Sequence, residues 1–98
     1  IEEILKRLGK DEPTVAYGLE QVEEAAKLGA VEKLVLADSM LRESSDEQRL
    51  HLEEVMKEVE QKSGRIVVIS TEHEAGTKLV ALGGIASILR FPFFQANY

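Results

Sequence analysis

Residues 44–70, SSDEQRLHLEEVMKEVEQKSGRIVVIS, read as one helix followed by one strand. Ser44 and Ser45 each stand three residues before a Glu or Gln, so either serine can begin the helix with a capping box. Gly64 lies just past the last helical turn, and the β-branched run of residues 65–70 predicts a buried strand. The residues at helical spacing that predict the inward face of the helix are Leu52, Val55, Met56 and Val59.

The same alternation of helix and strand extends over the rest of the chain. The further helices predicted by apolar periodicity cover residues 1–8, 19–28 and 74–82. The further strands predicted by short β-favouring runs cover residues 15–17, 31–37 and 85–91. Asp38 and Ser39 end the strand of residues 31–37, and a short loop then leads to the capped helix. Strands that alternate with helices of this length predict a largely parallel sheet with helices on both faces.

The last strand explains the apolar run near the end of the chain. Gly83 and Gly84 would let the chain turn sharply out of the preceding helix. Pro92 would stop the strand where pairing ends. The residues expected to complete the buried sheet are Ile85, Ile88 and Leu89.

Composition restricts the classes of function. The 98 residues suffice for one domain, and the absence of cysteine excludes disulfides, thiolate nucleophiles and cysteine-based zinc sites. No apolar run approaches the roughly 20 residues of a membrane span, so we expect no membrane partner and a cytoplasmic location. The net charge is −6, and the basic residues are scattered among acidic ones. Nucleic-acid binders normally carry a basic stripe, so a protein partner is favoured.

Polar residues that follow strands are the candidates for chemistry. Asp38 follows one strand, and Glu72 and His73 follow another. Such groups can carry out acid–base or metal chemistry, but they are also ordinary loop and capping residues, which is the interpretation we favour. No zinc-binding helix, nucleophile elbow or phosphate loop surrounds them, so no catalytic, cofactor or metal site is predicted. The acidic residues expected to form a solvated helix face are Glu53, Glu54, Glu58 and Glu60.

Three segments together resemble one known family. They read AYGLEQVEEAAKLGAVEKLVLAD at residues 16–38, GRIVVISTEHEAGTKL at residues 64–79 and LGGIASILRFPF at residues 82–93. In this order they are similar to the C-terminal domain of the Pelota family. These proteins are archaeal and eukaryotic ribosome-rescue factors related to class-1 peptide release factors.

The resemblance implies a fold and a division of the chain. The fold would be a three-layer α/β/α sandwich with a mixed, mostly parallel four-stranded sheet, as in release-factor C-terminal domains and kink-turn-binding ribosomal proteins. Residues 1–12 would be a helix and linker from a preceding domain, residues 13–93 the domain itself, and residues 94–98 a tail. Arg90 would extend from the strand edge toward an acidic loop or a partner. The residues expected to contact partners are Arg90, His73, Glu72 and Asp38.

The resemblance also implies a function. Pelota-like factors recognise stalled ribosomes and act with a translational GTPase of the elongation-factor class and an ABC-type recycling ATPase. Their C-terminal domain would be a non-catalytic docking platform without a cofactor or direct RNA binding. Some family descriptions assign a divalent-metal endonuclease to the N-terminal domain of the full-length protein. The alternatives are a class-1 release-factor domain, a stand-alone kink-turn RNA-binding protein and a small α/β enzyme.

Overall fold

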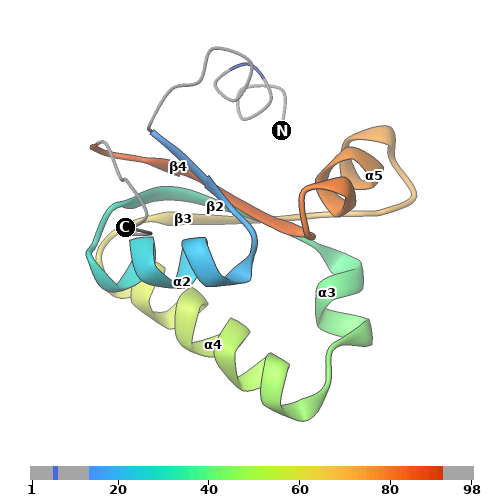
Figure 1. Cartoon of the computed structure of the whole chain (residues 1–98), viewed down its shortest axis with the longest axis horizontal. Coiled ribbons are helices and arrows are strands. Elements are labelled where there is room, and N and C mark those ends of the chain that lie inside the picture. The colour runs from blue at the N-terminus through green and yellow to red at the C-terminus, as the bar shows by residue number, and fades with distance from the viewer. Residues whose placement is uncertain (1–5, 7–13, 92–98) are drawn as a thin grey trace, which may run out of the picture.

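The structure is a computed structural model that describes residue 6 and residues 14–91, which form alternating strands and helices (Figure 1). In chain order these are β1 (Val15–Tyr17), α2 (Leu19–Lys27), β2 (Val31–Ala37), α3 (Asp38–Glu43), α4 (Asp46–Gln61), β3 (Arg65–Ile69), α5 (Glu74–Ala81) and β4 (Ile85–Leu89). Apart from residue 6, the predicted helix and linker of residues 1–12 lie outside the described residues, as do Pro92 and the tail of residues 94–98. None of the described helices is long and apolar enough to cross a bilayer.

The four strands form one mixed sheet in the order β1-β4-β2-β3. β2 and β3 are parallel, whereas β4 is antiparallel to both of its neighbours, β1 and β2. Three strands therefore run in one direction, as expected from the sequence, but two of the three neighbouring pairs are antiparallel. β4 is antiparallel to its neighbours because of the path of α5. Ala37 pairs with Ile69 at the end of β3, and Leu36 pairs with Ile85 at the start of β4, so α5 returns the chain to the end of the sheet where β3 finishes.

Helices α2 and α4 cover one face of the sheet and enclose the larger part of the core (Figure 1). Ser45 caps α4, because its Oγ accepts a hydrogen bond of 3.2 Å from the backbone N–H of Gln48. The predicted inward stripe of α4 is confirmed, since Leu52, Val55 and Val59 are buried and Met56 is partly buried. The cluster against which they pack includes Val22, Ala26, Leu34, Leu36 and Ile85.

Helix α5 packs against the opposite face, toward one end of the sheet (Figure 1). Leu79 is the buried residue that α5 contributes to this smaller cluster. The strand residues of the cluster are Val15, Val35, Ala37, Ala86 and Ile88. Helices therefore cover both faces, and the predicted burial of Ile85, Ile88 and Leu89 is confirmed.

The prediction that β3 is a buried strand is wrong. Among the described strands β3 lies at the edge of the sheet with β2 as its one neighbour, and Val67 and Val68 are 37% and 48% exposed. Ile66 and Ile69 on either side are only partly buried. A run of β-branched residues indicates a strand, but it does not state how many neighbours the strand has. The strand and β4 also end earlier than predicted, at Ile69 and Leu89.

The segment after β2 is a helix rather than the predicted loop. Asp38 is the first residue of α3, and its Oδ2 accepts a hydrogen bond of 2.9 Å from Nη1 of Arg42, one turn later. An acidic residue at the start of a helix and a basic residue in its last turn both interact favourably with the helix dipole. Asp and Ser start helices as readily as they end strands, which is why the sequence pattern was ambiguous here.

The glycine pair before β4 forms the sharp turn that the sequence predicts. Gly83 and Gly84 have φ angles of 102° and 84°, in the region that disfavours side chains. The turn is tied to β2, because the backbone N–H of Ala37 donates to the carbonyl oxygen of Gly84 at 2.8 Å. This turn sets β4 beside β2.

Candidate functional site

The fold gathers three of the four predicted contact residues at one end of the sheet. Because β2 and β3 are parallel, their carboxyl ends lie at the same end of the sheet. Asp38 follows β2, and Glu72 and His73 follow β3. The Asp38 side chain contacts the loop that follows β3. Its Oδ1 accepts hydrogen bonds from the backbone N–H of Thr71 at 3.0 Å and from the Thr71 hydroxyl at 3.1 Å.

These contacts give Asp38 a structural role. The hydrogen bond from the Thr71 backbone N–H is the main cause that lowers the pKa of Asp38 below its ordinary value of 3.8. Partial burial opposes this shift, and Arg42 and the Thr71 hydroxyl add to it. The carboxylate thus holds the start of α3 against the loop between β3 and α5. The oxygens of the Asp38 carboxylate face these internal donors. Glu72 and His73 therefore form the exposed part of this end of the sheet.

The lowered pKa predicts how the stability changes with pH. Asp38→Asn keeps the side-chain shape but removes the charge, so at pH 7 the variant should unfold at a lower denaturant concentration than the original chain. The contribution of the Asp38 charge to the free energy of unfolding is fully present above pH 3.8. It is lost as the pH falls through the lower pKa of the folded state. The difference between the two urea midpoints should therefore shrink below pH 3.8. A difference that stays constant down to pH 2 would show that the charge is irrelevant.

Glu72 and His73 are exposed on the loop that leads into α5. His73 occupies the N-cap position of α5, but its side chain makes no capping hydrogen bond. The backbone N–H of Glu72 donates to Ser70 Oγ at 3.1 Å, which shapes the loop and leaves the carboxylate outside. Neither side chain makes a hydrogen bond or ion pair with another described residue. Both are therefore accessible to a partner.

Arg90 lies at the opposite end of the sheet from the other three residues. It follows β4, whose direction is opposite to that of β2 and β3. Its backbone N–H donates to the carbonyl oxygen of Ala30 at 2.7 Å. Its guanidinium donates to the backbone carbonyl of Lys62. Among the described residues this guanidinium contacts a backbone carbonyl rather than an acidic side chain, and the contact with a partner stays a prediction. Arg90 joins the end of α4 to the sheet.

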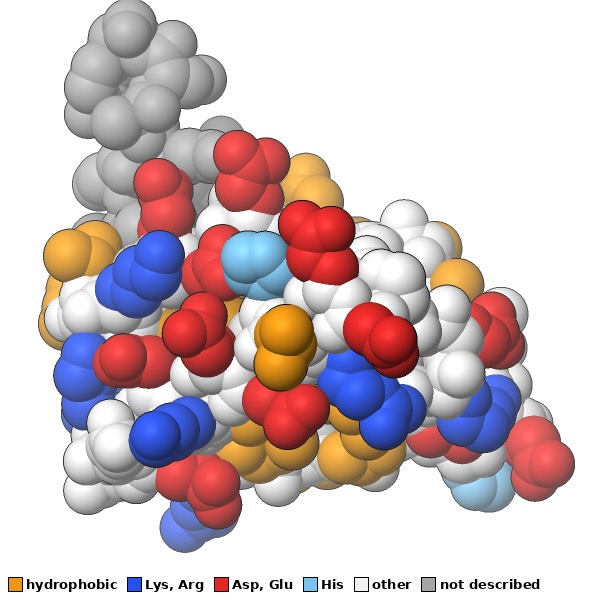
Figure 2. All heavy atoms as spheres, turned by 90° about the horizontal axis from the view of Figure 1, so that it is seen from below, with side chains coloured by type: hydrophobic (Ala, Val, Ile, Leu, Met, Phe, Trp, Pro, Cys, Tyr) orange, Lys and Arg blue, Asp and Glu red, His pale blue; other side chains and the backbone are white. Residues whose placement is uncertain are grey.

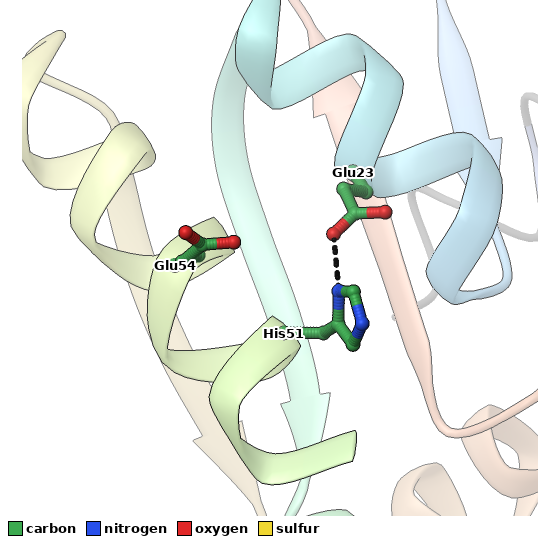
Figure 3. A group of neighbouring side chains, drawn as sticks. All are labelled: Glu23, His51 and Glu54. Atoms are coloured by element: carbon green, nitrogen blue, oxygen red, sulfur yellow. Dashed lines mark hydrogen bonds and ion pairs between the residues drawn. The ribbon is translucent and has the colours of Figure 1, made fainter. Parts of the chain in front are cut away.

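Sequence reasoning missed one cluster of titratable side chains. Glu23 of α2 lies beside His51 and Glu54 of α4 (Figure 3), and His51 Nδ1 is 2.9 Å from Glu23 Oε2. The hydrogen bond and charge of Glu23 raise the pKa of His51, with smaller contributions from Glu54 and Glu47. The only sequence signal was the three-residue spacing of His51 and Glu54, which places both on one side of a helix.

The surface formed by α2 and α4 carries mixed charges. Figure 2 shows this face with acidic side chains interspersed among basic ones, and no continuous basic area is visible in the view. Between the two helices lies a hollow of about 250 Å³ lined mostly by polar and charged residues, including Glu23, Lys27, Glu54 and Lys57. Its chemistry suits ions or a charged partner rather than an apolar small molecule.

The fold and the sequence together define a translation-factor domain. The chain belongs to the family described as eRF1 domain 3, which matches residues 1–93. It is similar to the C-terminal domain of Pelota homologues, and one of these, from Thermococcus onnurineus, is 48% identical over 93% of this chain and 25% of the relative.

Solved structures agree with this assignment. Dom34 of S. cerevisiae, described as a translation termination-like factor that acts in RNA quality control and interacts with Hbs1, is 36% identical, with a TM-score of 0.92 over 99% of this chain and 27% of Dom34. Archaeal Pelota, described as ribosome-bound together with ABCE1, is 45% identical, with a TM-score of 0.82 over 95% of this chain and 25% of that protein. The chain thus spans about a quarter of the length of these relatives.

Proposed function

We propose that this domain is the protein-docking module of a Pelota-like factor that recognises stalled ribosomes and promotes their rescue and mRNA surveillance. Its partners would be a translational GTPase of the elongation-factor class and an ABC-type recycling ATPase. The observation that carries the proposal is the similarity over nearly the whole chain to Pelota and Dom34, whose descriptions name Hbs1, ABCE1 and the ribosome. That similarity favours a rescue factor over the class-1 release-factor alternative. The site of action would be the ribosome in the cytoplasm.

The charge of the domain supports docking to protein rather than to RNA. The net charge is −6, and the helical face in Figure 2 intersperses basic with acidic side chains. About six to ten phosphate contacts are typical of salt-dependent nucleic-acid binding, and each needs a nearby Lys or Arg. A protein partner has no such requirement, and acidic groups can steer encounter with a basic surface. The domain would have no catalytic step of its own and would need no catalytic cofactor.

The exposed end of the sheet is the surface that we assign to docking. Glu72 and His73 project from a loop that internal hydrogen bonds hold in shape, so a partner would meet a preformed contact. Asp38 would act indirectly by positioning this loop, and Arg90, at the other end of the sheet, would belong to a separate contact area. Both arrangements refine the expectation that these four residues contact partners.

The direct test compares protein binding with RNA binding. The immobilised domain is expected to retain the GTPase or the recycling ATPase of the same organism in a pull-down with purified proteins. Titration with kink-turn RNA and with unstructured RNA is expected to give no binding in the micromolar range at physiological salt. Retention of neither protein, together with micromolar RNA binding, would contradict the proposal and favour the kink-turn alternative.

A charge reversal tests the assigned docking surface. Glu72→Lys is expected to weaken retention of the partner, because it inverts the charge at the centre of the exposed loop. Glu60→Lys makes the same chemical change at an exposed position of α4 and should leave retention unchanged. Equal effects of the two variants would mean that net charge alone governs binding and that the loop is not the contact.

A further inference from the structure

Three side chains of types that can ligate a metal meet on the outer side of the α2–α4 pair. Glu23, His51 and Glu54 each offer one ligand atom, and these atoms lie within 4.8 Å of one another (Figure 3). The imidazole and the Glu23 carboxylate point toward each other across the two helices, with Nδ1 and Oε2 2.9 Å apart. Glu54 lies one turn after His51 on the same helix and is exposed, so its side chain can rotate toward them.

The core holds the two helices that carry these side chains in a fixed relation. Val22 and Ala26 flank Glu23 on α2 and are buried, and Leu52 and Val55 flank His51 and Glu54 on α4 and are also buried. These four residues belong to one apolar cluster. The positions of the Cα atoms of the three ligands are therefore set by close packing, so an ion could be held by rotation of side chains without movement of the helices.

Glu23 and His51 need only a small adjustment to hold an ion, and Glu54, whose ligand atom lies within 4.8 Å of theirs, must rotate closer. Two ligands about 2.0–2.1 Å from a tetrahedral zinc ion lie roughly 3.3 Å apart. The distance of 2.9 Å between the Glu23 oxygen and the His51 nitrogen is close to this value, and in the ion's absence a proton occupies the space between them. One imidazole and two carboxylates form a mixed nitrogen and oxygen set, which suits zinc and similar transition ions better than magnesium.

We propose that Glu23, His51 and Glu54 form a binding site for one divalent transition-metal ion of the zinc class. The ion would clamp α2 to α4 and keep a coordination position open to solvent. This departs from the expectation from sequence of no metal site, because the meeting of α2 with α4 was not visible there. The charged groups around the cluster are Glu20, Glu47 and Glu58 together with Lys27 and Lys57, an acidic majority that favours a cation.

Zinc titration of chelator-treated protein tests the site. Isothermal titration calorimetry near pH 7.5 is expected to give one bound Zn²⁺ per chain. Thermal unfolding should shift upward by about 6–10 °C when free Zn²⁺ is ten times the Kd. Mg²⁺ at the same concentration should produce no comparable shift, because it retains its water ligands and prefers oxygen.

Ligand variants locate the bound ion, and the second histidine supplies a matched control. His51→Ala and Glu23→Gln are each expected to lower the zinc affinity at least about tenfold. His73→Ala removes the only other histidine of the chain and should leave the affinity unchanged. His51 and His73 are exposed and Glu23 is partly buried, and circular dichroism of the zinc-free variants checks that each still folds. Absence of zinc binding, loss of affinity in His73→Ala, or equal responses to Zn²⁺ and Mg²⁺ would overturn the proposal.

Discussion

Leu34→Ala is expected to lower the free energy of unfolding by about 2–5 kcal/mol. Leu34 lies in the central strand β2 and is 0% exposed, in the cluster that the sheet forms with α2 and α4. Alanine would remove its apolar contacts and leave a cavity. Strands on both sides and helices on one face limit how far the surroundings can collapse into that cavity, so the cost should lie well above that of an ordinary substitution.

Leu50→Ala is the matched control for this prediction. It makes the same chemical change on α4, where Leu50 is 65% exposed, and should change the free energy of unfolding by less than about 0.5 kcal/mol. Urea denaturation of the three proteins, with similar m-values, measures the two differences. Equal losses would show that the assignment of the inner and outer faces is wrong.

Gly76→Ala should destabilise the domain by more than about 2 kcal/mol, although alanine is the better helix former. Gly76 is buried in α5, where the helix crosses the loop that leads out of β3. A Cβ atom at this position would lie 2.0 Å from the carbonyl oxygen of Ser70 and 2.8 Å from Cα of Thr71. Both are backbone atoms, so the helix and the loop would have to separate.

The sign of the change distinguishes this contact from helix propensity. In an exposed helix interior, replacing glycine by alanine raises the free energy of unfolding by about 1 kcal/mol. A rise of this kind in Gly76→Ala would show that α5 is not in close contact with the loop. Thr77→Ala, at the next and exposed position of α5, should change the stability by less than about 0.5 kcal/mol. Chemical denaturation and thermal unfolding of both variants provide the measurement. Gly76→Ala should also disturb Glu72 and His73, because it moves the loop that presents them.

Local patterns were sufficient to predict most elements of the fold. The serine cap of α4, the stripe of α4 and the glycine pair before β4 each depend on residues that are close in the chain, and all three were predicted, although the choice between Ser44 and Ser45 was left open. The burial of β3 was not, because exposure at Val67 and Val68 depends on the order of strands in the sheet. That order follows from the path of α5 over one end of the sheet, which apolar periodicity does not encode.

The site was predictable to a smaller degree. Residues that follow parallel strands meet at one edge, so Asp38, Glu72 and His73 could be grouped once β2 and β3 were placed side by side. The structural role of Asp38 required the position of Thr71, 33 residues away. The meeting of Glu23 and His51, which lie 28 residues apart, depends on the register between α2 and α4. A single sequence gives no measure of that register.

The central place of β4 affects the order in which the domain is completed during synthesis. β4 is the last of the described strands, yet it pairs with β1, the first of them, and with β2. Among the described strands β1 has no neighbour other than β4, so its backbone groups cannot pair with them until residues 85–89 have left the ribosomal exit tunnel. Until then β2 and β3 present an open edge, where pairing with another chain is a hazard. The sheet of the nascent domain is therefore completed late, when β4 inserts between β1 and β2, which were made long before it.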